Sequence, residues 1–178
     1  MPRYEIRIAG FGGQGVITIG RIMGIAAALY EKKNAVQTQS YGPESRGGAC
    51  RADVVLSEGE IHYPHVRSAD VFVALSQTAQ DVYLKNLKPG GLLIVDPLTV
   101  IQDPPRTDIR FVKVPTAEMA HAVENKKFQN MVALGAFCRL TGMISPEALE
   151  KAIAETVPSI TLPQNIEAFR KGMNYVRP

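Results

Sequence analysis

The sequence is poor in the residues that bind metal ions and iron–sulfur clusters. Its 178 residues include only two cysteines, Cys50 and Cys138, which lie far apart and outside the paired spacing of zinc ribbons and cluster proteins. The three histidines, His62, His65 and His121, show no metal-ligand spacing either. We therefore expect no metal and no cluster on this chain, and we interpret both cysteines as small buried hydrophobic residues.

Charge of one sign, long apolar runs and targeting signals are also scarce. The 20 lysines and arginines exceed the 17 acidic residues by only three, which is too little for a nucleic-acid footprint. The most apolar long stretch, Gly15–Tyr30, is interrupted by Arg21 and is shorter than the ~20 residues that a membrane-spanning helix needs. The first residues lack a charged head followed by a long apolar segment, so no secretory signal is expected. These absences predict a cytoplasmic protein that binds neither nucleic acid nor membranes.

Before the last third of the sequence, hydrophobic patterns typical of strands alternate with patterns typical of helices. The length and the 46% apolar content predict one domain, residues 1–178. The predicted fold is a three-layer α/β/α domain with a largely parallel, mixed sheet, a Rossmann-like start and a helical C-terminal part. One hairpin, between residues 49–56 and 61–63 across the turn 57–60, is expected as the antiparallel exception. Predicted strands are 4–9, 35–39, 49–56, 71–75, 92–95 and 109–114, and predicted helices are 14–31, 76–87, 116–124, 127–140, 146–157 and 165–175. Ser76 or Thr78 and Ser145 with Pro146 indicate helix starts, and Gly142 indicates a helix end.

A glycine-rich turn, Gly10–Gly15, follows the first predicted strand and opens the first predicted helix. Its sequence GFGGQG fits G-x-G-x-x-G, whose backbone amides, together with the partly positive helix N-terminus, bind phosphate or another anion. A site for NAD also needs an acid at the end of the second strand, and Gln37–Ser40 contains none. Two interpretations remain open, an anion-binding turn and a tight turn that lets helix and strand approach. In both, a β-branched residue at Gly12 is expected to damage the turn.

A second glycine-rich segment, Tyr41–Gly48, lies between two predicted strands. Its sequence YGPESRGG combines a restricted proline, permissive glycines and two charged side chains. Arg46 stands beside two glycines, where its guanidinium can reach a carboxylate or phosphate with little obstruction. Alternatively, Glu44 and Arg46 pair with each other and fix the turn.

Together the two glycine-rich segments carry a resemblance to a known family. GFGGQGV at residues 10–16, followed about one βα unit later by YGPESRGG, resembles the gamma subunit, or fused gamma domain, of the 2-oxoacid:ferredoxin oxidoreductases. The resemblance covers nearly the whole chain, and other stretches agree with it: Ile61, Pro64, Val66, Ala69–Asp70 and Asn130–Gly135.

The resemblance implies a place in a larger enzyme. Enzymes of this family convert a 2-oxoacid, coenzyme A and oxidised ferredoxin into acyl-CoA, carbon dioxide and reduced ferredoxin, using thiamine diphosphate with magnesium and iron–sulfur clusters. The chain has no cysteine-rich motif and no Gly-Asp-Gly segment for the diphosphate, so these cofactors are expected on the alpha, beta and ferredoxin-like delta subunits. The gamma subunit is expected to be structural, to serve the coenzyme A side of the reaction and to hold no catalytic residue.

The resemblance also supplies candidate contacts for coenzyme A or a partner chain. They are Gly12, Gly13, Gln14, Gly15, Tyr41, Gly42, Pro43, Glu44, Arg46 and Gly47. For the substrate, 2-oxoglutarate is favoured over pyruvate and branched-chain oxoacids such as ketoisovalerate. A subunit of an indolepyruvate (arylpyruvate) oxidoreductase and a stand-alone NAD-binding Rossmann-type oxidoreductase remain as alternatives. The isolated chain is expected to be inactive and colourless.

Replacing Arg46 distinguishes the two interpretations of its segment. An exposed local pair contributes ~0–1 kcal/mol, whereas removing one member of a desolvated pair across an interface costs ~2–5 kcal/mol. We expect Arg46→Ala to leave the melting temperature of the subunit nearly unchanged, and to weaken complex assembly or raise the KM for coenzyme A tenfold or more. A large loss of melting temperature alone would make Arg46 a structural residue, and no change in any of the three quantities would leave it a surface residue.

Overall fold

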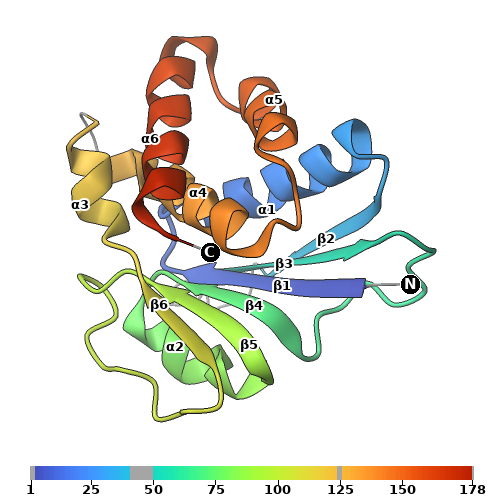
Figure 1. The fold of residues 1–178 in the computed structure, drawn as a ribbon, viewed down its shortest axis with the longest axis vertical. Coiled ribbons are helices and arrows are strands. Elements are labelled where there is room, and N and C mark those ends of the chain that lie inside the picture. Colours follow the sequence, from blue (N-terminus) through green and yellow to red (C-terminus); the bar gives the residue numbers. More distant parts are fainter. Residues whose placement is uncertain (1–2, 41–49, 124–125, 178) are drawn as a thin grey trace.

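The computed structural model describes residues 3–40, 50–123 and 126–177, and the six candidate contacts between Tyr41 and Gly47 lie outside them. The described residues form three layers (Figure 1), with a six-stranded sheet between a large group of helices and a single helix, α2. This arrangement confirms the predicted α/β/α fold. None of the described helices is long and apolar enough to cross a membrane.

The sheet has the strand order β2-β3-β1-β4-β5-β6. Its strands are β1 (Arg3–Gly10), β2 (Asn34–Ser40), β3 (Cys50–Ser57), β4 (Ala69–Ala74), β5 (Leu87–Val95) and β6 (Arg110–Lys113). β3 pairs antiparallel with β1 on one side and with β2 on the other, whereas β1, β4, β5 and β6 pair in parallel. Among the described strands β3 alone runs in the opposite direction, so the sheet is largely parallel and mixed, as predicted.

The predicted hairpin across residues 57–60 is wrong. Residues 58–68 contain no strand, because β3 is already paired with β1 on one side and with β2 on the other. Glu5 accepts hydrogen bonds from the backbone N–H groups of Arg67 and Ser68, at 2.9 and 3.1 Å. Burial raises the pKa of Glu5, but the Ser68 amide, the Arg3 guanidinium and the Arg67 amide together lower it below its usual value.

Helices cover the two faces of the sheet unequally. One face carries α1 (Val16–Ile25), which continues as a π-helical turn (Ala26–Tyr30), together with α3 (Thr116–His121), α4 (Gln129–Thr141), α5 (Pro146–Thr156) and α6 (Leu162–Tyr175). The other face carries α2 (Gln77–Tyr83), and short 3₁₀ turns occupy Leu84–Asn86, Lys126–Phe128 and Ser159–Thr161. The alternation along β1 sends Ile6 and Ile8 into the core under the first group and Ala9 into the core under α2.

The structure contains helix caps at three of the predicted helix ends. The hydroxyl of Ser76 accepts from the N–H of Ala79 at the start of α2, and Ser145 accepts from Ala148 at the start of α5. Gly142 ends α4 in the left-handed conformation, with φ 60°. These residues explain why the sequence predicted the starts of α2 and α5 and the end of α4 to within a residue or two.

A buried ion pair fixes the antiparallel register of β1 and β3. Arg7 and Asp53 stand directly opposite each other and are only 4% and 3% exposed. Two hydrogen bonds join them, Nε–Oδ1 at 2.8 Å and Nη2–Oδ2 at 2.9 Å. Arg7 also donates to the carbonyl of Val66 and lies over the ring of Tyr83 in α2. A one-residue slip would leave a buried charge unpaired, which is costly, so the pair selects this register.

The closest helix contact is the crossing of α4 and α6, where the two backbones touch. A Cβ atom added to Gly135 would lie 1.9 Å from the carbonyl oxygen of Phe169, and one added to Gly172 would lie 2.0 Å from that of Val132. Because both obstacles are backbone atoms, no side-chain rotation can relieve the contact. The crossing therefore requires glycine on both helices.

Substituting one of these glycines should destabilise the protein by separating the two helices. We expect Gly135→Ala to lower the free energy of unfolding by about 3 kcal/mol and the melting temperature by roughly 6–12 °C. The control is Gly24→Ala in α1, where no atom lies within 4 Å of the added Cβ; it should be neutral or stabilising by up to ~1 kcal/mol. Thermal melts of both variants test the crossing, and equal melting temperatures would refute it.

Candidate functional site

The two glycine-rich segments leave the sheet at the same edge. Gly10, the last residue of β1, pairs with Cys50, the first residue of β3. Ser40, the last residue of β2, pairs with Arg51. Ser40 and Cys50, which flank residues 41–49, therefore lie at the same end of the sheet as the start of the Gly10–Gly15 turn. The carboxyl ends of parallel strands in α/β sheets are where ligands usually bind.

The side chain of Gln14 holds the glycine-rich turn in place. Its Oε1 accepts from the N–H of Phe11 at 2.6 Å, and its Nε2 donates to the carbonyl of Leu75, just beyond β4, at 2.8 Å. Gly10 lies beneath this amide, because a Cβ there would be 2.4 Å from Oε1. Both polar ends of Gln14 are thus engaged within the protein, so its main effect on a ligand is to position the turn. Direct contact between Gln14 and a ligand stays a prediction.

The glycines of the turn differ in their φ angles and in the space available for a side chain. Gly13 and Gly15 have positive φ angles, 89° and 74°, which favour glycine. A Cβ on Gly15 would also lie 2.3 Å from Nδ2 of Asn130. Gly12 is exposed, has no positive φ, and leaves nothing within 4 Å of an added Cβ. The space around Gly12 does not support the steric reason for expecting that a β-branched residue there damages the turn, and the tight position is Gly15. The effect of a β-branched residue itself stays a prediction.

Two helix N-termini meet at this turn. α1 starts at Val16, after the N-cap residue Gly15, without a side-chain cap and without an acid in its first turn. The N-cap residue of α4, Phe128, likewise provides no side-chain cap, and the first turn of α4 has no acid. The contact between Gly15 and Asn130, the second residue of α4, brings the two starts together. Because each helix N-terminus carries a partial positive charge, this corner of the sheet favours an anionic ligand.

The topology argues against an NAD site. In a dinucleotide-binding unit the second strand lies next to the first, and an acid at its end holds the ribose. Here β3 separates β1 from β2, so the end of β2 is one strand farther from the turn. The residues there, Gln39 and Ser40, also carry no acid. Strand order and sequence together disfavour dinucleotide binding.

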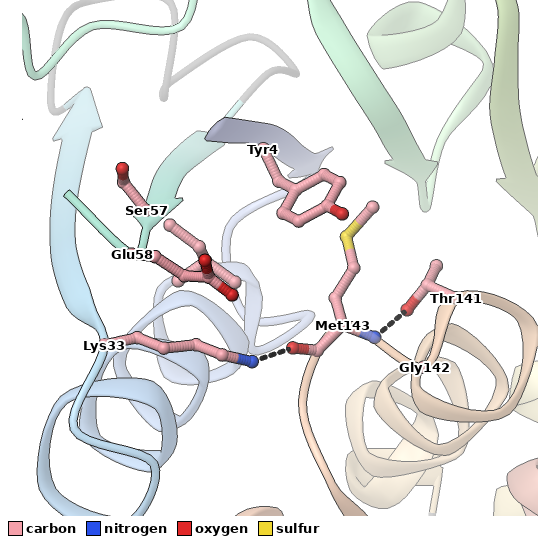
Figure 2. Close-up of a pocket in the computed structure, with 8 residues that line it drawn as sticks. Tyr4, Lys33, Ser57, Glu58, Thr141, Gly142 and Met143 are labelled. Atoms are coloured by element: carbon pink, nitrogen blue, oxygen red, sulfur yellow. Dashed lines mark hydrogen bonds between the residues drawn. The ribbon is translucent and has the colours of Figure 1, made fainter. Parts of the chain in front are cut away.

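A separate cavity lies at the opposite end of β1 and β3 (Figure 2). Its volume is about 190 Å³, and Tyr4, Lys33, Leu56, Ser57, Glu58, Thr141, Gly142 and Met143 line it. Lys33, whose Nζ points into the space between the strands and α4, donates to the carbonyl of Met143 at 2.8 Å and to Glu31 at 2.7 Å. Its charge is already balanced, and the cavity is far from the glycine-rich turn, so it is not part of the candidate site.

The cysteines and histidines show no sign of catalytic use. Burial raises the pKa of the Cys138 thiol to about 11, with a further contribution from the negative charges of Glu147 and Glu31. Burial also raises the pKa of Cys50, which is half-buried at the start of β3. The three histidines are exposed. Within the described ranges, no group of three or more histidine, cysteine, aspartate or glutamate residues could hold a metal ion.

Comparison with known proteins identifies the family. Residues 5–175 match the family described as pyruvate ferredoxin/flavodoxin oxidoreductase. A "2-oxoglutarate synthase subunit KorC" of Methanocaldococcus jannaschii is 48% identical and covers 96% of this chain and 92% of its own length. A solved structure, the gamma subunit of a keto/oxoacid ferredoxin oxidoreductase from Geobacter sulfurreducens, is 42% identical with a TM-score of 0.87, over 96% of each chain.

A third relative carries the same fold inside a larger chain. The 2-oxoglutarate:ferredoxin oxidoreductase from Magnetococcus marinus, solved with 2-oxoglutarate, coenzyme A and succinyl-CoA bound, is 26% identical with a TM-score of 0.88. The match spans 98% of this chain and 31% of that one. The protein therefore belongs to the pyruvate ferredoxin/flavodoxin oxidoreductase family. Within it, the chain is a gamma subunit of the 2-oxoacid:ferredoxin oxidoreductase type.

Paired substitutions in the turn test the difference between its glycines. We expect Gly15→Ala to lower the melting temperature by roughly 2–8 °C, because a left-handed φ costs ~1–2 kcal/mol and the new Cβ displaces Asn130. Gly12→Ala should melt within a degree or two of the parent, since its Cβ meets nothing. Comparable losses in both variants would show that the turn is closed around Gly12 after all.

Proposed function

We propose that this gamma subunit serves a multi-subunit 2-oxoglutarate:ferredoxin oxidoreductase, at the side of the complex that binds coenzyme A. The reaction converts 2-oxoglutarate, coenzyme A and oxidised ferredoxin into succinyl-CoA, carbon dioxide and reduced ferredoxin. The observation that carries the proposal is the register of β1, β2 and β3, which brings Gly10, where the first segment begins, to the same end of the sheet as Ser40 and Cys50, which flank the second.

The chemistry of that edge suits the phosphate groups of coenzyme A. The turn presents exposed backbone at Gly12 and Gly13, beside the uncapped N-terminus of α1. Gln14 and Gly15 hold this backbone in position. The residues proposed from the second segment, Tyr41 to Glu44 with Arg46 and Gly47, lie outside the described residues and stay candidates from the sequence, in which Arg46 supplies a positive charge suited to phosphate.

The relatives support 2-oxoglutarate as the substrate. Three archaeal proteins called 2-oxoglutarate synthase subunit KorC are each 48% identical to this chain over at least 96% of it. A pyruvate synthase subunit from Methanothermobacter thermautotrophicus is only 29% identical. The pattern disfavours an indolepyruvate oxidoreductase and a stand-alone NAD enzyme.

The cofactors of the reaction belong to other chains in this proposal. Both cysteines have raised thiol pKa values, and the described carboxylates and histidines form no cluster, so the donor set does not fit an iron–sulfur centre or a magnesium diphosphate site. Thiamine diphosphate with magnesium would provide the decarboxylation, and the iron–sulfur clusters would transfer electrons to ferredoxin. The alpha, beta and delta subunits would bind these cofactors. We place the complex in the cytoplasm.

Co-purification of the tagged chain from its native cell, followed by assays of the complex, tests the proposal. We expect thiamine-binding and ferredoxin-like subunits to co-purify, ferredoxin reduction to require coenzyme A, and kcat/KM to be highest for 2-oxoglutarate in a panel with pyruvate, ketoisovalerate and indolepyruvate. The separated chain should be colourless and inactive. A complex that prefers another oxoacid would refute the substrate, and a separated chain that contains stoichiometric iron or flavin would refute the division of roles.

A further inference from the structure

Asn130 has an amide nitrogen without an acceptor at the point where α1 and α4 begin. The residue is 6% exposed, and its Oδ1 accepts a hydrogen bond from the N–H of Met131 at 3.0 Å. No described residue accepts a hydrogen bond from its Nδ2. The nitrogen is not among the described buried polar atoms that lack a hydrogen-bond partner, so water or a ligand can reach it. Asn130 therefore keeps one accessible donor on a side chain that is otherwise packed within the protein.

The free nitrogen is directed at the glycine-rich turn. Nδ2 is the side-chain atom nearest to Gly15, 2.3 Å from the position that a Cβ there would take. Only a glycine at residue 15 lets the amide approach so closely. The turn thus combines three kinds of donor or positive charge at one place: its own backbone, the N-terminus of α1, and Nδ2 of Asn130.

We infer that Nδ2 of Asn130 donates a hydrogen bond to a phosphate oxygen of the ligand bound at the Gly10–Gly15 turn. This inference rests on the proposed function, which assigns coenzyme A to the turn, and it adds to the site a residue of α4, more than 100 positions farther along the sequence. The ligand oxygen is the acceptor that the amide lacks within the protein.

The chemistry of the side chain sets the direction of each substitution. Asn130→Ala removes the donor and adds no charge. Asn130→Asp keeps the size and shape but replaces the donor with a carboxylate, which repels phosphate. We therefore expect the KM for coenzyme A to rise about tenfold in Asn130→Ala, and further in Asn130→Asp. The KM for 2-oxoglutarate should stay within twofold in both variants.

Asn165 provides a matched control. It is also 6% exposed and also lies in a helix, α6, but its Nδ2 donates to the carbonyl of Thr161 at 2.7 Å. Asn165→Asp should lower the melting temperature of the complex and leave the KM for coenzyme A unchanged. All variants are compared in the assembled complex, with assembly measured by size-exclusion chromatography.

The outcomes separate this inference from the proposed function. A parent complex whose activity does not depend on coenzyme A refutes the proposed function without any variant. If the parent depends on coenzyme A, a KM for coenzyme A within twofold of the parent in both Asn130 variants overturns the inference alone. Equal rises in the KM for both substrates, or loss of assembly in both variants, makes Asn130 a packing residue and also overturns it. A selective rise that is larger for Asp than for Ala supports it.

Discussion

The contact between the backbones of α4 and α6 is the constraint on which the helical layer depends. Gly135 and Gly172 let the two helices approach until each meets a carbonyl oxygen of the other. Phe169 and the other buried residues around the crossing then join the main core, where α4 is buried along nearly its whole length. Because α4 is fixed in this way, its first turn is also fixed.

That position of α4 connects the helical core to the glycine-rich turn. The start of α4 places Asn130 against Gly15, which in turn sets where α1 begins. From the other side, Gln14 ties the same turn to the end of β4. The backbone amides of the turn are therefore oriented by elements from distant parts of the sequence before any ligand arrives, which reduces the entropic cost of binding.

The sequence predicted those features that depend on neighbouring residues. Ser145 and Gly142 marked helix ends through their own hydrogen bonds and φ angles, and the glycines after β1 marked the turn. Features that depend on distant residues were not predictable. The pattern G-x-G-x-x-G does not tell which glycine faces another element, and it is Asn130 that makes Gly15 tight while Gly12 stays open.

The same limit explains the wrong hairpin. The residues after Ser57 have turn chemistry and are followed by apolar residues, which is typical of a hairpin. The sequence could not show that β2 and β1 would flank β3, or that Glu5 would bind the amides of Arg67 and Ser68. For the candidate site, the position of the turn between β1 and α1 was predicted, whereas the proposed role of Asn130 had no local signal apart from its place in the family resemblance.

The reversed strand has a consequence for how variants of the second glycine-rich segment can be interpreted. β3 is paired along its whole length with β1, through the buried Arg7–Asp53 pair, and along most of its length with β2. Its register is thus secured from both sides by the ladders themselves. The described ladders account for the alignment of β1, β2 and β3. A variant of the second glycine-rich segment that binds a ligand or partner less well would therefore report on lost contacts and not on misaligned strands.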